Sequence, residues 1–175
     1  MADGFALTES TYYILLSLVR PRHGYGIMQL TEELSGGRVH LAAGTLYGAL
    51  NALCSKGWII QLPAEDESRR KEYRLTEKGL QVLRGEVARL RELADNGERV
   101  LTEELSGGRV HLAAGTLYGA LNALCSKGWI IQLPAEDESR RKEYRLTEKG
   151  MQVLRGEVAR LRELADNGEK VLAEE

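Results

Sequence analysis

Three consecutive cations, Arg69, Arg70 and Lys71, form the densest group of charge that could bind another molecule, and they recur as Arg140, Arg141 and Lys142. Each triplet stands in a polar segment between two apolar runs, which is typical of the tip of a β-hairpin. Cations held together at such a tip can neutralise phosphates or enter a minor groove. An isolated basic triplet is more often only a solvated loop, so the elements that present it decide its meaning.

A helical stretch over residues 43 to 55 supplies the second candidate surface. Leu46, Leu50 and Leu53 share one face with Ala49 and Cys54, while the opposite face carries Thr45, Gly48, Asn51, Ala52 and Ser55, with Tyr47 at its edge. Small and hydrogen-bonding side chains allow that face to approach another surface closely. The net charge of -2 and the pI of about 6.0 give no overall attraction to polyanions, so binding to phosphate depends on these local groups.

The sequence lacks the residue patterns that metal, cofactor and catalytic sites require. His23, His40 and His111, with one cysteine in each copy of a repeat, offer no zinc-ligand spacing, and we expect no metal. Cys54 and Cys125 lie on apolar helix faces and are expected to be buried, inert thiols. Gly24-Tyr25-Gly26 lacks the third glycine and the preceding strand of a dinucleotide site, and no nucleophile elbow or phosphate loop occurs. We therefore expect no cofactor and no enzyme activity.

The sequence is dominated by a repeat. Residues 31–101 and 102–172 have the same sequence at an offset of 71 residues, except that Met151 replaces Leu80 and Lys170 replaces Arg99. Residues 1–30 occur once, so the second copy lacks whatever they form. The predicted domains are a complete unit over 1–101 and a truncated unit over 102–175, and the duplication could be natural or engineered.

The remaining elements follow from patterning. Thr8 is a predicted N-cap of a first helix, a break at residues 20–24 precedes a second helix over 25–34, and residues 38–41 alternate like a short strand. Two strands are predicted at 58–62 and 72–75, and Thr76 caps a last helix. The order helix, helix, strand, helix and hairpin defines a winged helix-turn-helix. The predicted fold class is mainly α with small β wings (α+β), with a C-terminal dimerisation helix, duplicated without the first helix.

Two helices carry more apolar surface than one core needs. The first is apolar around most of its circumference, and a partner subunit is the simplest cover for it. The last has an apolar seam at spacings of three and four, typical of a helix that packs on another helix. The predicted dimerisation residues are Tyr12, Leu15, Leu16, Val19, Leu80, Leu83, Val87, Leu90 and their second-copy counterparts Met151, Leu154, Val158 and Leu161.

Three ordered motifs carry a resemblance to a known family: Pro21 to Gly26, Gly44 to Leu50, and Arg69 to Gly79. Together they resemble the PadR family of transcriptional regulators over residues 5 to 101, and the last two motifs return at 115–121 and 140–150. Ala43 departs from the proline of many members, which should reduce rigidity at the helix start without changing the contact mode.

The resemblance implies a homodimeric repressor held by its first and last helices. It places the basic triplets in the wings and the DNA-reading residues near the start of each recognition helix, namely Gly44, Thr45, Tyr47, Gly48, Gly115, Thr116, Tyr118 and Gly119. Some members bind planar aromatic drugs at the dimer centre. Here only Tyr12 and Tyr13 could stack on such an inducer, because the last helix has no aromatic residue, and we expect little drug binding.

The second copy is predicted to be incomplete. Its counterparts of Tyr25, Ile27 and Met28 are Asn96, Glu98 and Arg99, so the apolar face of the second helix is lost. The missing first helix removes about 5 to 10 kcal/mol of stabilisation by burial, enough to prevent independent folding. The second copy must therefore borrow a surface from its own first copy or from another chain. The junction at 95–98 allows either a kink at Gly97 or one long helix.

We therefore expect a cytoplasmic DNA-binding transcriptional regulator, a repressor that binds double-stranded DNA at a palindromic operator. One unit per chain should dock, and the duplication should alter or weaken binding. The absence of long apolar runs and of a secretory signal favours this location, away from membranes. The alternative is an assembly protein without DNA binding, left after duplication disrupted the regulator.

Overall fold

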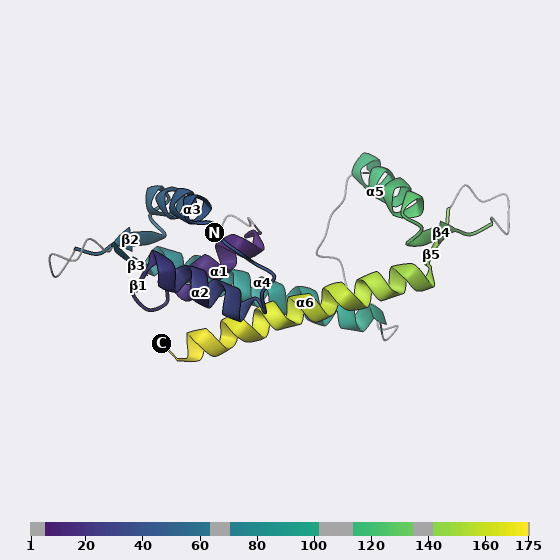
Figure 1. Cartoon of the computed structure of the whole chain (residues 1–175). Coiled ribbons are helices and arrows are strands. Elements are labelled where there is room, and N and C mark those ends of the chain that lie inside the picture. Colours follow the sequence, from purple (N-terminus) through teal and green to yellow (C-terminus); the bar gives the residue numbers. More distant parts are fainter. Residues whose placement is uncertain (1–5, 64–70, 102–113, 135–141, 175) are drawn as a thin grey trace. The chain divides into compact units, whose positions relative to one another are not determined.

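A computed structural model describes residues 6–63, 71–101, 114–134 and 142–174. It divides into two compact units, 1–90 with 163–175 and 91–162, so that the long helices α4 (Glu77–Leu101) and α6 (Glu148–Ala173) each contribute to both. Figure 1 shows the elements in chain order. The sequence prediction of domains at 1–101 and 102–175 stays a prediction.

The first helix, α1 (Glu9–Ser17), begins where the sequence predicts. The Thr8 hydroxyl accepts a hydrogen bond from the Thr11 amide at 3.3 Å, and Glu9 lies in the first turn, where the positive end of the helix favours a carboxylate. All side chains from Tyr12 to Leu18 are buried. The helix is therefore enclosed on every side, as its continuous apolar sequence predicts.

A short strand and the second helix follow directly. β1 (Arg22–His23) leads into α2 (Gly24–Leu34), whose first turn is capped by the His23 side chain: its Nδ1 accepts from the Gly26 amide at 3.1 Å. The helix ends before Gly36 and Gly37, which have φ values of 59° and 79°. The helix predicted over residues 25–34 is therefore confirmed.

The predicted strand over residues 38–41 is wrong, because this segment forms no sheet pairing. The Val39 amide donates instead to the Ser35 hydroxyl at 3.1 Å, and the Arg38 amide to the Ser35 carbonyl at 3.2 Å. These bonds hold the segment that follows α2 against the end of that helix. The third strand of the sheet is β1, which lies where the sequence predicted only a break between helices.

The third helix and the hairpin agree with the prediction. α3 (Ala43–Ser55) buries Leu46, Leu50 and Leu53. β2 (Ile59–Gln61) and β3 (Glu72–Leu75) pair antiparallel, and β1 pairs on the other side of β3, giving the order β1-β3-β2. Tyr73 and Leu75 of β3 are buried, whereas its two other residues are exposed, so the strand covers the core with one face.

The last helix of the first copy is fixed at its start by Thr76. Its hydroxyl donates to the Gly57 carbonyl at 2.7 Å and accepts from the Gly79 amide at 3.0 Å. A side chain at Gly79 would collide with the Trp58 carbonyl, so only glycine allows this close contact between helix and hairpin. α4 then continues without a break through Gly97 to Leu101, which decides between the two geometries left open for the junction.

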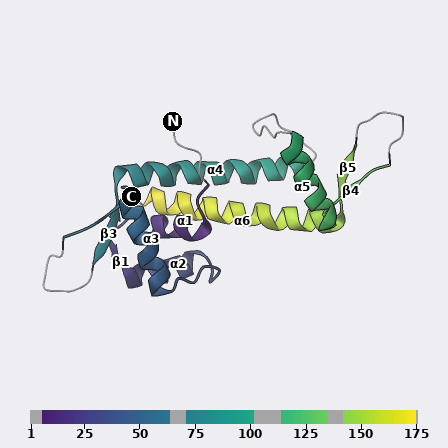
Figure 2. The same ribbon diagram turned by 90° about the horizontal axis from the view of Figure 1, so that it is seen from above.

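The second unit repeats the local structure of the first. It contains α5 (Ala114–Ser126), β4 (Ile130–Gln132) and β5 (Tyr144–Leu146), and Thr147 makes the same hydroxyl bonds at the start of α6 as Thr76 does at the start of α4. No counterpart of α1 or α2 occurs within its described residues. Figure 2 shows α5 beside its hairpin at the start of α6.

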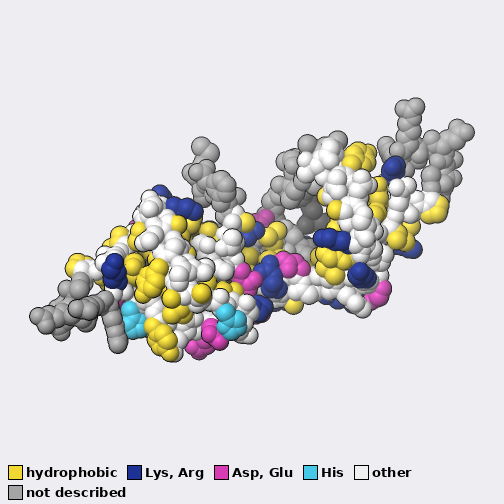
Figure 3. Space-filling view, turned by 45° about the horizontal axis from the view of Figure 1, so that its top comes forward, with side chains coloured by type: hydrophobic (Ala, Val, Ile, Leu, Met, Phe, Trp, Pro, Cys, Tyr) yellow, Lys and Arg dark blue, Asp and Glu magenta, His cyan; other side chains and the backbone are white. Residues whose placement is uncertain are grey.

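The missing helices leave the second copy less buried. Leu117 is 40% exposed, whereas Leu46, the same residue of the repeat, is fully buried. Figure 3 shows hydrophobic side chains at the surface of this unit. Among the described helices, none is long and apolar enough to cross a bilayer.

Candidate nucleic-acid interface

A groove of about 690 Å³ opens in the first unit where the start of α2, the outer face of α3 and the wing strand β3 meet. It is lined by His23, Gly24, Tyr25, Tyr47, Asn51, Lys71 and Tyr73. The groove is open to solvent and combines hydroxyl, amide, imidazole and ammonium groups. Such a lining suits a polar, anionic ligand better than an apolar one.

Tyr47 forms one wall of this groove. Its side chain leaves α3 toward the start of α2, and a Cβ placed on Gly24 would lie 2.9 Å from the Tyr47 hydroxyl. Glycine at position 24 therefore allows the tyrosine to lie against the helix start. The residue is still 47% exposed, and nearby Tyr25 is 63% exposed, so both phenol groups can reach a bound molecule.

The electrostatics of the groove favour a phosphate. The N-terminal end of an α-helix carries a partial positive charge from its unpaired amides, and the start of α2 supplies that end here. Lys71 is exposed and lines the same groove, and the pairing of His23 with Glu72 brings it beside this helix start. A cation and a helix end facing one opening are a common arrangement for holding a DNA backbone.

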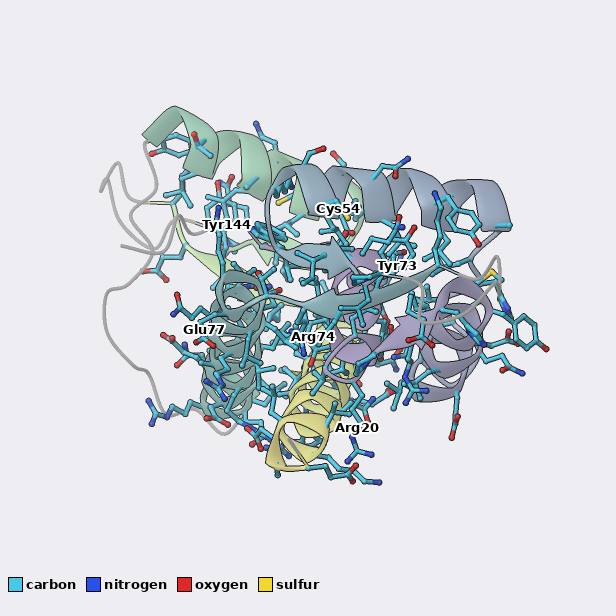
Figure 4. All side chains as sticks on the ribbon, turned by 90° about the vertical axis from the view of Figure 1, so that its left-hand side faces the viewer. Arg20, Cys54, Tyr73, Arg74, Glu77 and Tyr144 are labelled. Carbon is cyan, nitrogen blue, oxygen red and sulfur yellow. The ribbon has the colours of Figure 1, made fainter. Side chains whose placement is uncertain are left out.

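Tyr73 connects the groove to the core behind it. It lies on β3 beside the outward-facing Arg74, and the Cys54 side chain extends from α3 toward this strand (Figure 4). Burial raises the pKa of Tyr73 above its ordinary value, with smaller contributions from Cys54 and Tyr47. The tyrosine therefore stays neutral behind the groove.

The structure exposes the predicted reading residues of α3. Gly44, Thr45, Tyr47 and Gly48 all lie on its solvent side, with Lys71 across the groove. Arg69 and Arg70 lie outside the described residues, as do Arg140 and Arg141. Figure 3 shows lysine and arginine side chains in small groups among neutral ones, in agreement with local rather than general positive charge.

Sequence reasoning missed His23, Tyr25 and Tyr73 as parts of this surface. Their signal was the motif from Pro21 to Gly26, which carried the family resemblance and a predicted tight turn but no predicted site. His23 also had the position of an N-cap before a helix. The contribution of Tyr73 depends on the pairing of β3 with β1, which was not predicted.

The second copy exposes the same helix residues without the same groove. Gly115, Thr116, Tyr118, Gly119 and Lys142 are exposed. The positions that correspond to His23, Gly24 and Tyr25 are Ala94, Asp95 and Asn96, and these lie inside α4. The helix start that forms one wall of the first groove has therefore no counterpart there.

The predicted dimerisation residues are mostly buried within the chain. Tyr12, Leu15, Leu16, Leu80, Leu83, Val87, Leu90 and Val158 are buried, and Val19, Met151, Leu154 and Leu161 are half-buried. Tyr12 and Tyr13, the candidates for stacking an inducer, pack edge to face with centroids 5.5 Å apart. The surplus surface of α1, expected under a partner subunit, is covered by the chain's own α6: the Tyr12 hydroxyl donates to the Leu164 carbonyl at 2.6 Å.

Both free cysteines, Cys54 and Cys125, are half-buried, so the expected full burial of these thiols is wrong. Cys54 lies beside Leu50 and Leu53, which are buried, whereas the leucines around Cys125 are themselves only partly buried. No cluster of three metal-ligating side chains occurs in the part of the chain that the structure describes.

Three stacked helices followed by a β-hairpin, with the third helix exposed beside the wing, define the winged helix-turn-helix class of DNA-binding proteins. The sequence profile of the PadR-like transcriptional regulator family matches residues 14–85 and again 93–156. The chain belongs to this family, as its motifs predict. Its members are transcription factors rather than enzymes.

Solved structures of similar proteins include a PadR family regulator from Eggerthella lenta, with 30% identity, 52% of this chain and 80% of that chain covered, and a TM-score of 0.44. A PadR family regulator from Clostridium difficile has 23% identity, 52% and 97% coverage, and a TM-score of 0.42. RosR of H. salinarum has 24% identity, 72% and 97% coverage, and a TM-score of 0.40. No curated protein matches the chain.

Proposed function

We propose that this protein is a transcriptional repressor whose first copy reads DNA. The recognition helix α3 would enter the major groove with Thr45, Gly48 and Tyr47, and the wing would lie along the sugar-phosphate backbone. The observation that carries the proposal is the groove between the start of α2, Tyr47 and Lys71, because it joins a phosphate-binding helix end to the exposed face of the reading helix.

A pool of random-sequence duplexes tests DNA binding and supplies an operator at the same time. Duplexes that bind the purified chain are selected from the pool, and the affinity of the best one is measured at two salt concentrations. We expect sequence-selective binding that weakens steeply as salt rises, because basic side chains release counterions from the phosphates. If no duplex in the pool binds even at low ionic strength, the regulator is excluded and the assembly protein becomes the better explanation.

A matched pair of substitutions identifies the copy that reads DNA. Tyr47→Ala should lower affinity for the selected duplex about tenfold or more, since it removes a side chain at the centre of the interface. Tyr118→Ala, the same change in the second copy, should leave affinity nearly unchanged because α5 has no α2 beside it. Equal losses from both substitutions would contradict the assignment to the first copy.

Repression would follow from occlusion of a promoter by the bound chain. A reporter gene with the selected duplex inside its promoter should therefore be expressed less when the chain is present, and Tyr47→Ala should restore its expression. An unchanged or increased signal with the unmodified chain would overturn the repressor role while leaving DNA binding intact.

A palindromic operator offers two half-sites about 34 Å apart. Each chain has one complete reading unit, so two chains would fill the operator, and we infer that the duplication weakens binding relative to a protein with two complete units. The homodimer predicted from the sequence is the alternative to the pairing within one chain that is argued below. The cytoplasmic location stays a prediction of the sequence. So does a small-molecule inducer, for which the buried pair Tyr12 and Tyr13 offers little stacking surface.

A further inference from the structure

The C-terminal end of α6 packs against α1 and α2 within the first unit (Figures 1 and 2). Beside the bond from Tyr12 to Leu164, the Asn167 side-chain amide donates to the Leu34 carbonyl at 2.9 Å. The Arg20 guanidinium donates to the Glu174 carbonyl at 3.0 Å. These hydrogen bonds hold the last three turns of α6 against α1, the end of α2 and Arg20.

An ion-pair network adds charge to this contact. The Arg38 guanidinium donates to both carboxylate oxygens of Glu163 at 3.0 Å and to Glu9 at 3.2 Å. The hydrogen bonds that Arg38 donates to Glu163 raise the pKa of Arg38, so the guanidinium stays charged. Because Arg38 belongs to the first copy and Glu163 to the second, the network joins the two copies of the repeat.

The helices α4 and α6 also meet through reciprocal contacts. In the first unit Gly168 lies so close to Val87 and Tyr12 that a Cβ there would collide with both. In the second unit Gly97 lies equally close to Val158. Gly168 is the repeat counterpart of Gly97, and Val158 that of Val87. Such an exchange of equivalent residues is the signature of a two-fold interface between identical surfaces.

Equivalent residues of the two copies show how much burial α1 provides. Leu164 is 3% exposed, whereas its counterpart Leu93 is 39% exposed. Val171 is half-buried, and its counterpart Val100 is 46% exposed. The sequences around Leu93 and Leu164 are the same, and those before Val100 and Val171 differ only in Arg99 against Lys170. We therefore attribute the difference in burial to the presence of α1 in one place and its absence in the other.

We propose that residues 163–174 act in cis as a substitute for a partner subunit, covering the surface of α1 that the last helix of a second chain would otherwise cover. One chain then contains the pairing that two separate copies of the repeat would form. α1 offers no free surface to another molecule of this protein, so association through its first and last helices is blocked.

The mass of the purified full chain in solution tests this directly. We expect the mass of one chain, 19.5 kDa, over a wide range of concentrations. The melting temperature should be independent of concentration, because no subunit contact is lost on unfolding. A mass of two chains, or a melting temperature that rises with concentration, would overturn the proposal, since both indicate that α6 covers the α1 of another molecule.

A matched pair of variants tests the contact itself. Leu164→Asp places a charge against α1 and should lower the melting temperature by roughly 10 °C. Leu93→Asp makes the same change at the exposed counterpart and should shift it by less than about 2 °C. Glu163→Gln is a milder variant that removes the charge facing Arg38 and should give a smaller loss that disappears in high salt. Equal effects of the two aspartate variants would contradict the covering role of α6.

Discussion

Tyr12 combines the roles of core residue and hydrogen-bond donor. It is 1% exposed, and its hydroxyl is bonded to the carbonyl of Leu164, 152 positions further along the chain. Burial raises the pKa of Tyr12 well above its ordinary value, and the nearby Tyr13, Glu86 and Glu169 raise it further. The sequence predicts the burial because the first helix is apolar around most of its circumference, but it does not predict the bond, because no local pattern identifies so distant a partner.

This buried phenol predicts a loss of stability at alkaline pH. In the unfolded chain Tyr12 ionises near its ordinary pKa of 10.0, whereas in the folded chain it stays neutral. The free energy of unfolding should therefore fall as the pH rises above about 10. Tyr12→Phe should reduce this slope in denaturant titrations across that range, while lowering stability at neutral pH by about 1 kcal/mol. An unchanged slope would show that Tyr12 does not contribute.

At the scale of elements, α3 and α5 have identical sequences in different surroundings. Helix propensity, capping and the hairpin that follows are fixed locally, so both copies form the same helix and both could be predicted. Burial is not local: Leu46 is enclosed in the first copy and its counterpart Leu117 is not. The sequence predicted this deficit from the missing first helix.

Leu46 and Leu117 also allow a prediction about the free energy of unfolding. Leu46→Ala should lower the free energy of unfolding by about 2 to 5 kcal/mol, because it leaves a cavity in a packed core. Leu117→Ala should cost less than about 1 kcal/mol, since that side chain already contacts solvent. Denaturant titration of the two variants measures both values. A comparable loss at Leu117 would mean that the second copy has a closed core in solution.

The features predicted incorrectly or left open depend either on local hydrogen bonds that apolar alternation does not reveal or on long-range contacts. The alternation at 38–41 resembled a strand, but bonds to Ser35 hold this segment at the end of α2, and β1 joins the sheet instead. The groove beside Tyr47 required that pairing, so only its α3 wall and Lys71 were predicted. A last helix was the predicted cover of α1, and the sequence left open whether the second copy would share a surface with its own first copy or with another chain. In the structure, α6 of the same chain covers α1.

At the scale of the whole molecule, the two copies should differ in their opening motions. Peptides over 43–55 and 114–126 have the same sequence and mass, so hydrogen exchange measured by mass spectrometry reports them together. We expect two isotope envelopes, a slow one from α3 and a fast one from α5, because few buried contacts hold the second helix closed. A single envelope would show that both helices are equally protected.

The reciprocal contacts of Gly97 with Val158 and of Gly168 with Val87 also have a genetic consequence. In a symmetric pair of identical subunits, one codon change alters both sides of the interface at once. Here each side has its own codon, so the sides can diverge independently. The two copies already differ elsewhere, at Leu80 against Met151 and at Arg99 against Lys170. Joining two copies in one reading frame therefore removes the symmetry constraint under which such an interface would otherwise evolve.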